Sequence, residues 1–301
     1  MNVLVTGGTG FVGSALCREL DERGHDVTAL ARDPSGADLP DGVETYAGDV
    51  TDYGSIEGAF GGQDAVVHLV ALSPLFKPRG GREAYLDVNL GGTENVVAAA
   101  ETSDLDRIVL MSGLGADPDS PSYFLRSKGL AEAVVRDSDL EWVITRPSVV
   151  FGDGCEIVSF TKLVTTPYVT GLPGGGRETR FQLIWIEDLA PLLADCVEDD
   201  ERAGEVYEFG GPEVQDLAEI TKLVYRAEGK SASVVPIPMP LAKVGLALGD
   251  YVPFAPLGSD QYHGLALDNT PEENDVEQFG VDPAELRTFA DWLGLEADSE
   301  V

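Results

Sequence analysis

Three glycines at three-residue intervals constrain the fold of this chain more than any other feature. Gly7, Gly10 and Gly13 stand in the run TGGTGFVG, directly after the apolar segment 2–6 and at the start of a helical pattern of apolar residues. In a strand, turn and helix of this kind, the first glycine permits the tight turn, the second lets the backbone approach a diphosphate, and the third allows the helix to pack on the strand. A glycine hairpin without a ligand is the competing interpretation, and the order of strand, turn and helix argues against it.

Apolar runs and helical patterns alternate through the first half of the chain. The apolar runs lack polar alternation and are separated by helical stretches, as in a parallel sheet that is covered on both faces. We predict strands at 2–6, 26–31, 43–46, 65–71, 107–111 and 141–145, with helices near 53–60, 83–102 and 121–137. The predicted fold class is therefore α/β, a doubly wound parallel sheet of the Rossmann type with a smaller C-terminal lobe.

The alternation loosens after residue 152. The stretch 155–180 is predicted to hold turns, 181–190 resumes a strand-to-helix pattern, 205–209 is one more strand candidate, and 283–293 has the pattern of an amphipathic helix.

These patterns divide the chain into two parts. We predict a dinucleotide-binding domain over 1–153, to which 181–211 returns, and a smaller substrate or partner lobe over 154–180 and 212–301. In that lobe, the segments from Val235 to Leu241 and from Val252 to Leu257 are apolar enough to line a pocket or to touch a membrane surface. Ordinary packing of the lobe on the sheet is the competing interpretation.

The net charge narrows the classes of partner. With 20 Lys and Arg against 53 Asp and Glu, the formal net charge is -33, which repels a nucleic-acid backbone or an anionic membrane surface. We expect neither as a partner. Only six of the basic residues are Lys, and the acids are spread along the whole chain, which is typical of a protein adapted to a salt-rich cytosol. An acidic protein of an ordinary cytosol is the alternative.

The cysteines and histidines give no sign of a metal site or of a disulfide framework. Their number and spacing match neither, so we expect no metal and reduced thiols in a reducing compartment. These residues are Cys17, Cys155, Cys196, His25, His68 and His263. The first residues lack the basic and long apolar regions of a signal peptide, and no apolar run reaches the ~18 residues of a membrane span. The sequence therefore predicts a cytoplasmic protein.

The end of the second strand bears on the choice of cofactor. In proteins that bind NAD through this motif, an acid at this point usually accepts hydrogen bonds from the adenosine ribose. Here the strand ends in Ala31 followed by Arg32, and a guanidinium can pair with a 2′-phosphate through two parallel hydrogen bonds. The sequence favours NADP(H). NAD(H) is the alternative if the next residue, Asp33, reaches the ribose. Arg32 could also be a solvated surface charge without a role in binding.

Together with the glycine run, five further segments resemble the extended short-chain dehydrogenase/reductase superfamily, in which NAD-dependent epimerases and dehydratases belong, over nearly the whole chain. They are GDV at 48–50, VHLVA at 67–71, VNLGGTEN at 88–95, RPSVVFG at 146–152 and WIEDLA at 185–190. The resemblance implies that Asp49 meets the adenine and that the segment after Arg146 runs past the nicotinamide. The expected cofactor-binding residues are Gly7, Thr9, Gly10, Phe11, Val12, Gly13, Arg32, Asp49, Val50, Val70, Ala71, Leu72, Asn89, Lys128, Pro147 and Val149.

Within that superfamily, MSGLGA at 111–116, DSPS at 119–122 and the Pro-rich C-terminal part look most like atypical members related to the nucleotide-binding accessory subunit of respiratory complex I. Those relatives keep the cofactor fold, often without a demonstrated reaction. The resemblance implies peripheral contact with a respiratory complex or a link to quinone metabolism.

The catalytic position departs from the superfamily pattern. Catalytic members carry a Tyr four residues before a Lys on one helix, because four residues turn a helix by about 400° and place both side chains on one face. The cation lowers the pKa of the phenol. Here Phe124 stands four residues before Lys128, and Tyr123 stands five before it, roughly 140° away around the helix axis. In the preceding strand Ser112 offers a hydroxyl, whereas Gly113 offers none.

Two interpretations follow, and the sequence leaves both open. In the first, Tyr123 sits in an irregular first turn, and Tyr123, Lys128 and Ser112 catalyse oxidoreduction of a small carbonyl or alcohol substrate. In the second, Lys128 binds the ribose while proton transfer by the usual route is lost, which makes the protein a cofactor-holding or sensing protein; helical geometry favours this one. A redox-sensing regulator of transcription is a third class. The sequence indicates neither the substrate nor the oligomeric state.

Overall fold

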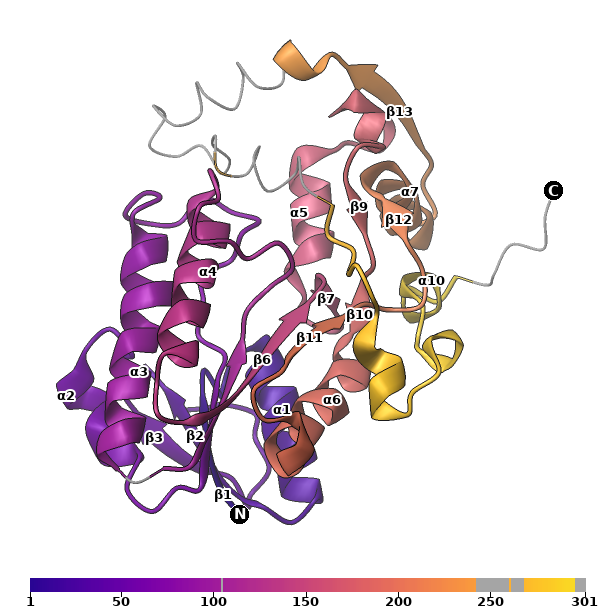
Figure 1. Cartoon of the computed structure of the whole chain (residues 1–301). Helices are drawn as coiled ribbons and strands as arrows, with labels where there is room; N and C mark the ends of the chain where they lie inside the picture. The colour runs from indigo at the N-terminus through magenta and orange to yellow at the C-terminus, as the bar shows by residue number, and fades with distance from the viewer. Residues whose placement is uncertain (104, 242–259, 261–267, 296–301) are drawn as a thin grey trace. The chain divides into compact units, whose positions relative to one another are not determined.

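The computed structural model describes residues 1–103, 105–241, 260 and 268–295 of the 301-residue chain (Figure 1). The apolar segment from Val252 to Leu257 and the histidine His263, both singled out in the sequence, lie outside the described residues.

A seven-stranded sheet forms the centre of the fold, in the order β11-β6-β5-β4-β1-β2-β3. The pairs β1–β2, β1–β4, β2–β3, β4–β5 and β5–β6 are all parallel. The strands are β1 Asn2–Thr6, β2 Asp26–Ala31, β3 Glu44–Ala47, β4 Ala65–His68, β5 Arg107–Met111, β6 Glu141–Pro147 and β11 Val206–Phe209. The predicted doubly wound parallel sheet is confirmed, and the strand order reverses between β1 and β4, where sheets of this type bind their ligands.

Helices cover both faces of this sheet. On one face α3 (Gly91–Thr102) and α4 (Tyr123–Arg136) contact each other, and on the other α1 (Phe11–Glu22) contacts α6 (Ile186–Glu198) (Figure 1). The short elements α2 (Tyr53–Ile56), η1 (Glu57–Ala59), the π-helical turn η2 (Leu86–Leu90) and η4 (Asp200–Arg202) complete this part. An apolar core on the α3 and α4 side includes Leu4, Val66, Leu110 and Val135.

The chain divides into two compact units. The first holds 1–72, 80–146 and 186–207, and the second holds 73–79, 147–185 and 208–301. Compared with the boundaries expected from the sequence, this division assigns 73–79, 147–153, 181–185 and 208–211 to the second unit.

The second unit contains helices and strands that the sequence patterns did not indicate. Its strands form pairs: β7 (Val150–Phe151) with β10 (Ile184–Trp185), β8 (Tyr168–Pro173) with β13 (Ala232–Ile237), and β9 (Arg180–Phe181) with β12 (Gln215–Asp216). Its helical elements are α5 (Glu156–Val164), α7 (Leu217–Ala227), η3 (Gly174–Gly176), η5 (Asp275–Phe279), η6 (Pro283–Glu285) and α10 (Phe289–Trp292). Within 155–180, the expected turn at 173–176 is present, with positive φ at its three glycines, whereas α5 and β8, which the sequence did not indicate, occupy most of the rest.

The predicted amphipathic helix over 283–293 is also wrong. The segment splits into η6 and the one-turn helix α10, with the extended residue Leu286 after η6. The side chain of Asp282 accepts from the Ala284 amide and that of Thr288 accepts from the Asp291 amide. Each hydrogen bond caps a separate helix start, so the backbone begins a new turn instead of continuing one helix.

Across the part of the chain that the structure describes, none of the helices combines the length and the apolar character needed to cross a membrane.

Candidate active site

The glycine run forms a tight turn between β1 and α1. Gly7 has φ +79°, in the left-handed region that favours glycine, and its amide donates to the Leu30 carbonyl oxygen at 2.8 Å. A Cβ on Gly13 would lie 2.1 Å from the Gly7 carbonyl oxygen, so only glycine permits this approach of helix and turn. A Cβ on Gly10 would meet only that same oxygen within 4 Å, at 3.1 Å. The turn is closed on the Gly13 side and open at Gly10.

The first backbone amides of α1 follow Gly10. Gly10 is the N-cap of α1, and Ser14 is the residue whose amide donates back to the Gly10 carbonyl oxygen, at 2.9 Å. The amides of Phe11, Val12 and Gly13 therefore precede the intrahelical hydrogen bonds. Together with the positive end of the helix dipole they offer donors to a diphosphate, as the sequence predicts for this stretch, and Thr9 lies in the same turn.

The end of β2 presents a cation rather than a free carboxylate. Arg32 is exposed, and its charge contributes to lowering the pKa of Asp49 at the end of β3, where hydrogen bonds from Thr51 are the larger cause. Asp33 is tied to its own loop, since one carboxylate oxygen accepts from both the amide and the hydroxyl of Ser35, and these bonds lower its pKa. Val50, next to Asp49, is buried, and its carbonyl oxygen accepts from the side chain of Asn95 at 2.8 Å.

Asn89 joins two of the predicted binding segments. It lies buried in the π-helical turn η2, and its Oδ1 accepts from the Leu72 amide at 2.9 Å while its Nδ2 donates to the Ser127 hydroxyl at 2.9 Å. The half-buried residues Val70 and Ala71 precede Leu72 on the same loop after β4. Asn89 thus fixes the exit of β4 against α4, beside Lys128.

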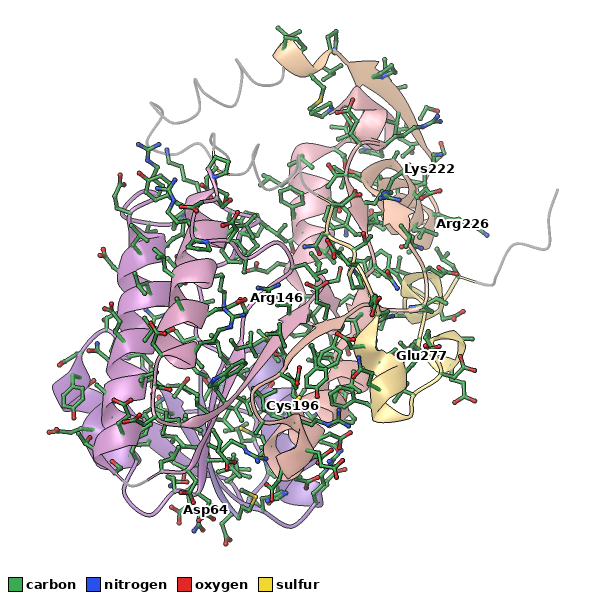
Figure 2. The ribbon with its side chains drawn as sticks, in the orientation of Figure 1. Asp64, Arg146, Cys196, Lys222, Arg226 and Glu277 are labelled. Atoms are coloured by element: carbon green, nitrogen blue, oxygen red, sulfur yellow. The ribbon has the colours of Figure 1, made fainter. Side chains whose placement is uncertain are left out.

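Lys128 is a buried ammonium at the end of β5. Its Nζ donates to the Met111 carbonyl oxygen at 2.8 Å. Burial lowers the pKa of Lys128 to about 8, while the charge of Glu132 acts in the opposite direction. Glu132 is held in turn by Arg146, whose Nε and Nη2 donate to its two carboxylate oxygens at 2.8 and 2.7 Å, and by Arg136 (Arg146 is labelled in Figure 2). The acidic partner one turn along α4 is thereby fixed in place.

A buried histidine that the sequence did not indicate as a site residue lies in the same region. His68, at the end of β4, shares a hydrogen bond of 2.6 Å between its Nδ1 and the Thr6 hydroxyl. Burial, and then the charge of Lys128, lower the pKa of His68 to about 3, so the ring is neutral. The spacing of the three histidines carried no signal of a site; a histidine at the carboxyl end of a buried parallel strand does carry one, because ligands bind at that edge.

Tyr123 and Phe124 open α4. Tyr123 is the first residue of a regular helix whose N-cap, Ser122, accepts from the Leu125 amide at 3.5 Å. The ring of Tyr123 lies under the guanidinium groups of Arg82 and Arg126, 4.7 and 5.2 Å from its centroid.

Phe124, four residues before Lys128, meets the ring of Tyr85 edge to face, with 5.7 Å between the centroids. The residue that shares a helix face with Lys128 is therefore an aromatic ring without a hydroxyl.

Pro147 and Val149 belong to the second unit. Pro147 ends β6, and the amide of Val149 donates to the side-chain oxygen of Asn269 at 3.0 Å. The hydroxyl of Ser148 donates to Asn269 as well, so this segment is anchored within its own unit.

Comparison with known proteins identifies the family. A family model described as NAD(P)H-binding matches residues 7–178. The chain belongs to the NAD(P)H-binding family. The match begins at Gly7 and includes the glycine turn, Asn89 and Lys128, so these parts of the site lie within the region that the family shares. A nicotinamide dinucleotide fits them, because Gly10 leaves space beside free amides and Lys128 is a buried donor at the strand ends.

Relatives of this NAD(P)H-binding protein include oxidoreductases and a respiratory subunit. It is 29% identical over 95% of its length to the Arabidopsis thaliana NADH dehydrogenase [ubiquinone] 1 alpha subcomplex subunit 9, mitochondrial, of which it covers 75%. It is 27% identical to an NAD(P)H azoreductase of Xenophilus azovorans, with 98% of each chain covered. Among solved structures, the UDP-glucose 4-epimerase of Thermus thermophilus in complex with NAD superimposes with a TM-score of 0.72 at 22% identity, covering 98% of this chain and 97% of that one. This last similarity shows the fold alone.

Proposed function

We propose that this protein is an NADPH-dependent oxidoreductase. The observation that carries the proposal is Lys128, a buried ammonium with one donor on the carbonyl oxygen of Met111. The next residue, Ser112, has a buried hydroxyl without a hydrogen-bond partner among the described residues. A bound nicotinamide would supply a hydride. The chain's own groups would hold the diphosphate at the amides after Gly10 and the ribose at Lys128. A similar azoreductase that matches over the whole chain supports a reductive role.

The preference for NADPH rests on the end of β2. Arg32 is exposed, so its guanidinium can pair with a 2′-phosphate, and Asp33, the carboxylate that would reach the ribose on the NAD(H) alternative, is bound to Ser35. We expect Arg32→Gln to weaken NADPH binding about tenfold and to leave NADH binding unchanged. Arg177→Gln, which removes an exposed arginine of the second unit, is the matched control for lost charge. Equal dissociation constants of the wild type for NADH and NADPH would refute the role of Arg32.

A reductase of this kind needs a proton donor other than the tyrosine of its catalytic relatives. Phe124 has no acidic proton, and Tyr123 lies on another side of α4 under two guanidinium groups. Water or the substrate itself could donate the proton. The test is NADPH oxidation with quinones, aldehydes and keto sugars, comparing wild type with Tyr123→Phe. We expect turnover that survives Tyr123→Phe; its loss would place the phenol in the mechanism.

A non-catalytic, cofactor-holding protein is the second candidate, and Phe124 is the observation that favours it. A subunit of mitochondrial NADH dehydrogenase is 29% identical to this chain, which supports peripheral contact with a respiratory complex or its quinone. On this alternative no substrate supports NADPH oxidation, and the protein co-purifies with respiratory-complex subunits in a manner that depends on NADPH. This alternative is excluded if a substrate supports NADPH oxidation and if co-purification with respiratory-complex subunits does not depend on NADPH.

We propose that the protein functions in the cytoplasm. All three cysteines, Cys17, Cys155 and Cys196, are buried free thiols, which supports a reducing compartment. Fractionation of the source cells with an antibody tests this placement.

A further inference from the structure

Two buried polar atoms near Lys128 have no hydrogen-bond partner among the residues that the structure describes. They are Nε2 of His68 and the hydroxyl oxygen of Ser112, in residues 1% and 5% exposed. Folded proteins pair nearly all such atoms, and they use ordered water where no protein group reaches. Two such atoms near a buried ammonium are therefore suited to bind a small polar molecule.

The pleat of the sheet places these groups on one side. Side chains two residues apart in a strand share a face. His68 follows Val66 by two residues, and both apolar residues Val66 and Leu110 belong to the core on the α3 and α4 side. Ser112 lies one residue past β5 and two past Leu110, and its amide continues the pairing with β6 by donating to the Thr145 carbonyl oxygen at 2.7 Å. His68 is also the register partner of Leu110 on the neighbouring strand.

Lys128 reaches the same side from the helix. It lies three residues before Ala131 and seven before Val135, two residues of α4 in that core, so the three share a helix face. The buried hydroxyl of Thr145 also lacks a partner among the described residues, but it lies on the other side, because its neighbour Ile144 points into the core.

Hydrogen-bond chemistry sets the roles of the atoms. An ammonium has three donors and no acceptor, and Lys128 uses one donor on Met111. A water molecule that accepts from a second donor has its own two hydrogens left to give, and His68 Nε2 and the Ser112 oxygen are the two unpaired acceptors. Nε2 accepts only if Nδ1 carries the ring proton, in which case Nδ1 donates to the Thr6 hydroxyl, 2.6 Å away.

We propose that His68, Ser112 and Lys128 hold one buried water molecule, and that His68 is a positioning residue that directs the third donor of Lys128 toward the nicotinamide ribose. The inference rests on the proposed cofactor-binding role of Lys128. The charged groups around the site are Lys128 itself, Glu132 one turn along α4, and Arg146, which pairs with Glu132. Because the imidazole stays neutral, it adds no positive charge beside the ammonium.

The tautomer of His68 gives the first test, on the full chain without cofactor. The chain has three histidines, so nitrogen-15 NMR of the imidazole rings can be assigned with the single variant His68→Asn. We expect a neutral ring from pH 5 to 8 with the proton on Nδ1. A proton on Nε2, or protonation of the ring near pH 6.5, would overturn the proposal.

Cofactor affinity gives the second test, measured as the NADPH dissociation constant by fluorescence. We expect His68→Phe to weaken binding about tenfold and Ser112→Ala about threefold, because each removes an acceptor for the water. Thr145→Val, which removes an equally buried unpaired hydroxyl on the other side of the sheet, should bind like the wild type. Equal weakening by Thr145→Val, or no weakening by Ser112→Ala, contradicts the water site. If the wild type binds no NADPH, the proposed function fails instead. The water site is then still tested by the tautomer of His68, because a proton on Nε2 contradicts it.

Discussion

The cost of burying Lys128 predicts an unusual dependence of stability on pH. The pKa of Lys128 is 10.5 in an exposed lysine and about 8 in the folded protein. Below pH 8 the ammonium is charged in both states, so the folded state carries the whole cost of burial. As the pH rises through 8, the folded protein releases this proton before the unfolded chain does, and the free energy of unfolding rises until pH 10.5. The difference between the two pKa values corresponds to about 3 kcal/mol, of which about 2 kcal/mol falls between pH 7 and 9.5.

The variant Lys128→Met removes this titration while keeping a side chain of similar length. We expect the variant to be more stable than the wild type at pH 7, and this advantage to shrink by about 2 kcal/mol at pH 9.5. The assay is urea unfolding at fixed KCl between pH 7 and 9.5. The comparison must be a difference between the two proteins, because burial raises the pKa of Cys17 and Cys196 from 9.0 to about 12 and lowers stability as the pH rises above 9. Those thiols are present in both proteins and cancel. A difference that stays constant from pH 7 to 9.5 would refute the reasoning.

Three further predictions concern the turn, the core and the surface. Gly13→Ala should destabilise the fold by about 3 kcal/mol, because its Cβ would lie 2.1 Å from a backbone oxygen. Gly10→Ala should keep most of its stability against urea but lose NADPH binding. Equal stability of the two variants would contradict this prediction. Arg107→Ala should lower the free energy of unfolding by about 2 kcal/mol in the same assay, because it leaves the buried Val197 carbonyl oxygen without its donor while the acids Glu141 and Asp200 stay solvated. A loss below about 0.5 kcal/mol, the usual scatter of surface substitutions, would show that water replaces the donor. With a net charge of -33, the melting temperature should rise with KCl concentration; a protein equally stable in low salt is not adapted to a salt-rich cytosol.

Local patterns were sufficient for the first unit. The apolar runs between glycines and helical stretches predicted six strands to within a few residues. Buried strands such as β1, β4 and β5 are apolar along most of their length, which makes them easy to recognise, whereas the edge strand β3 is mostly exposed. The glycine spacing predicted the turn, in which the positive φ of Gly7 and the close approach of Gly13 to the Gly7 carbonyl oxygen both favour glycine. The distance of four residues between Phe124 and Lys128 already indicated that the usual tyrosine is absent.

The second unit was harder to predict because its elements are short and half exposed. One helix start there does have a local sequence signal: Asp216 and Glu219 form a capping box at the start of α7, with reciprocal hydrogen bonds of 2.8 Å. By contrast, β8 and β13 are more than sixty positions apart along the chain and stabilise each other only after pairing, so neither has a local pattern that identifies it.

The sequence by itself determined the motif that holds a dinucleotide, the strands that surround it and the loss of the catalytic tyrosine, since each depends on residues that are neighbours along the chain. Only the tertiary structure decided that Thr6, His68, Ser112 and Lys128 belong to one buried polar group. Their proximity depends on β4 and β5 lying beside β1 in an order that does not follow the chain, and on burial, which keeps His68 neutral and lowers the pKa of Lys128.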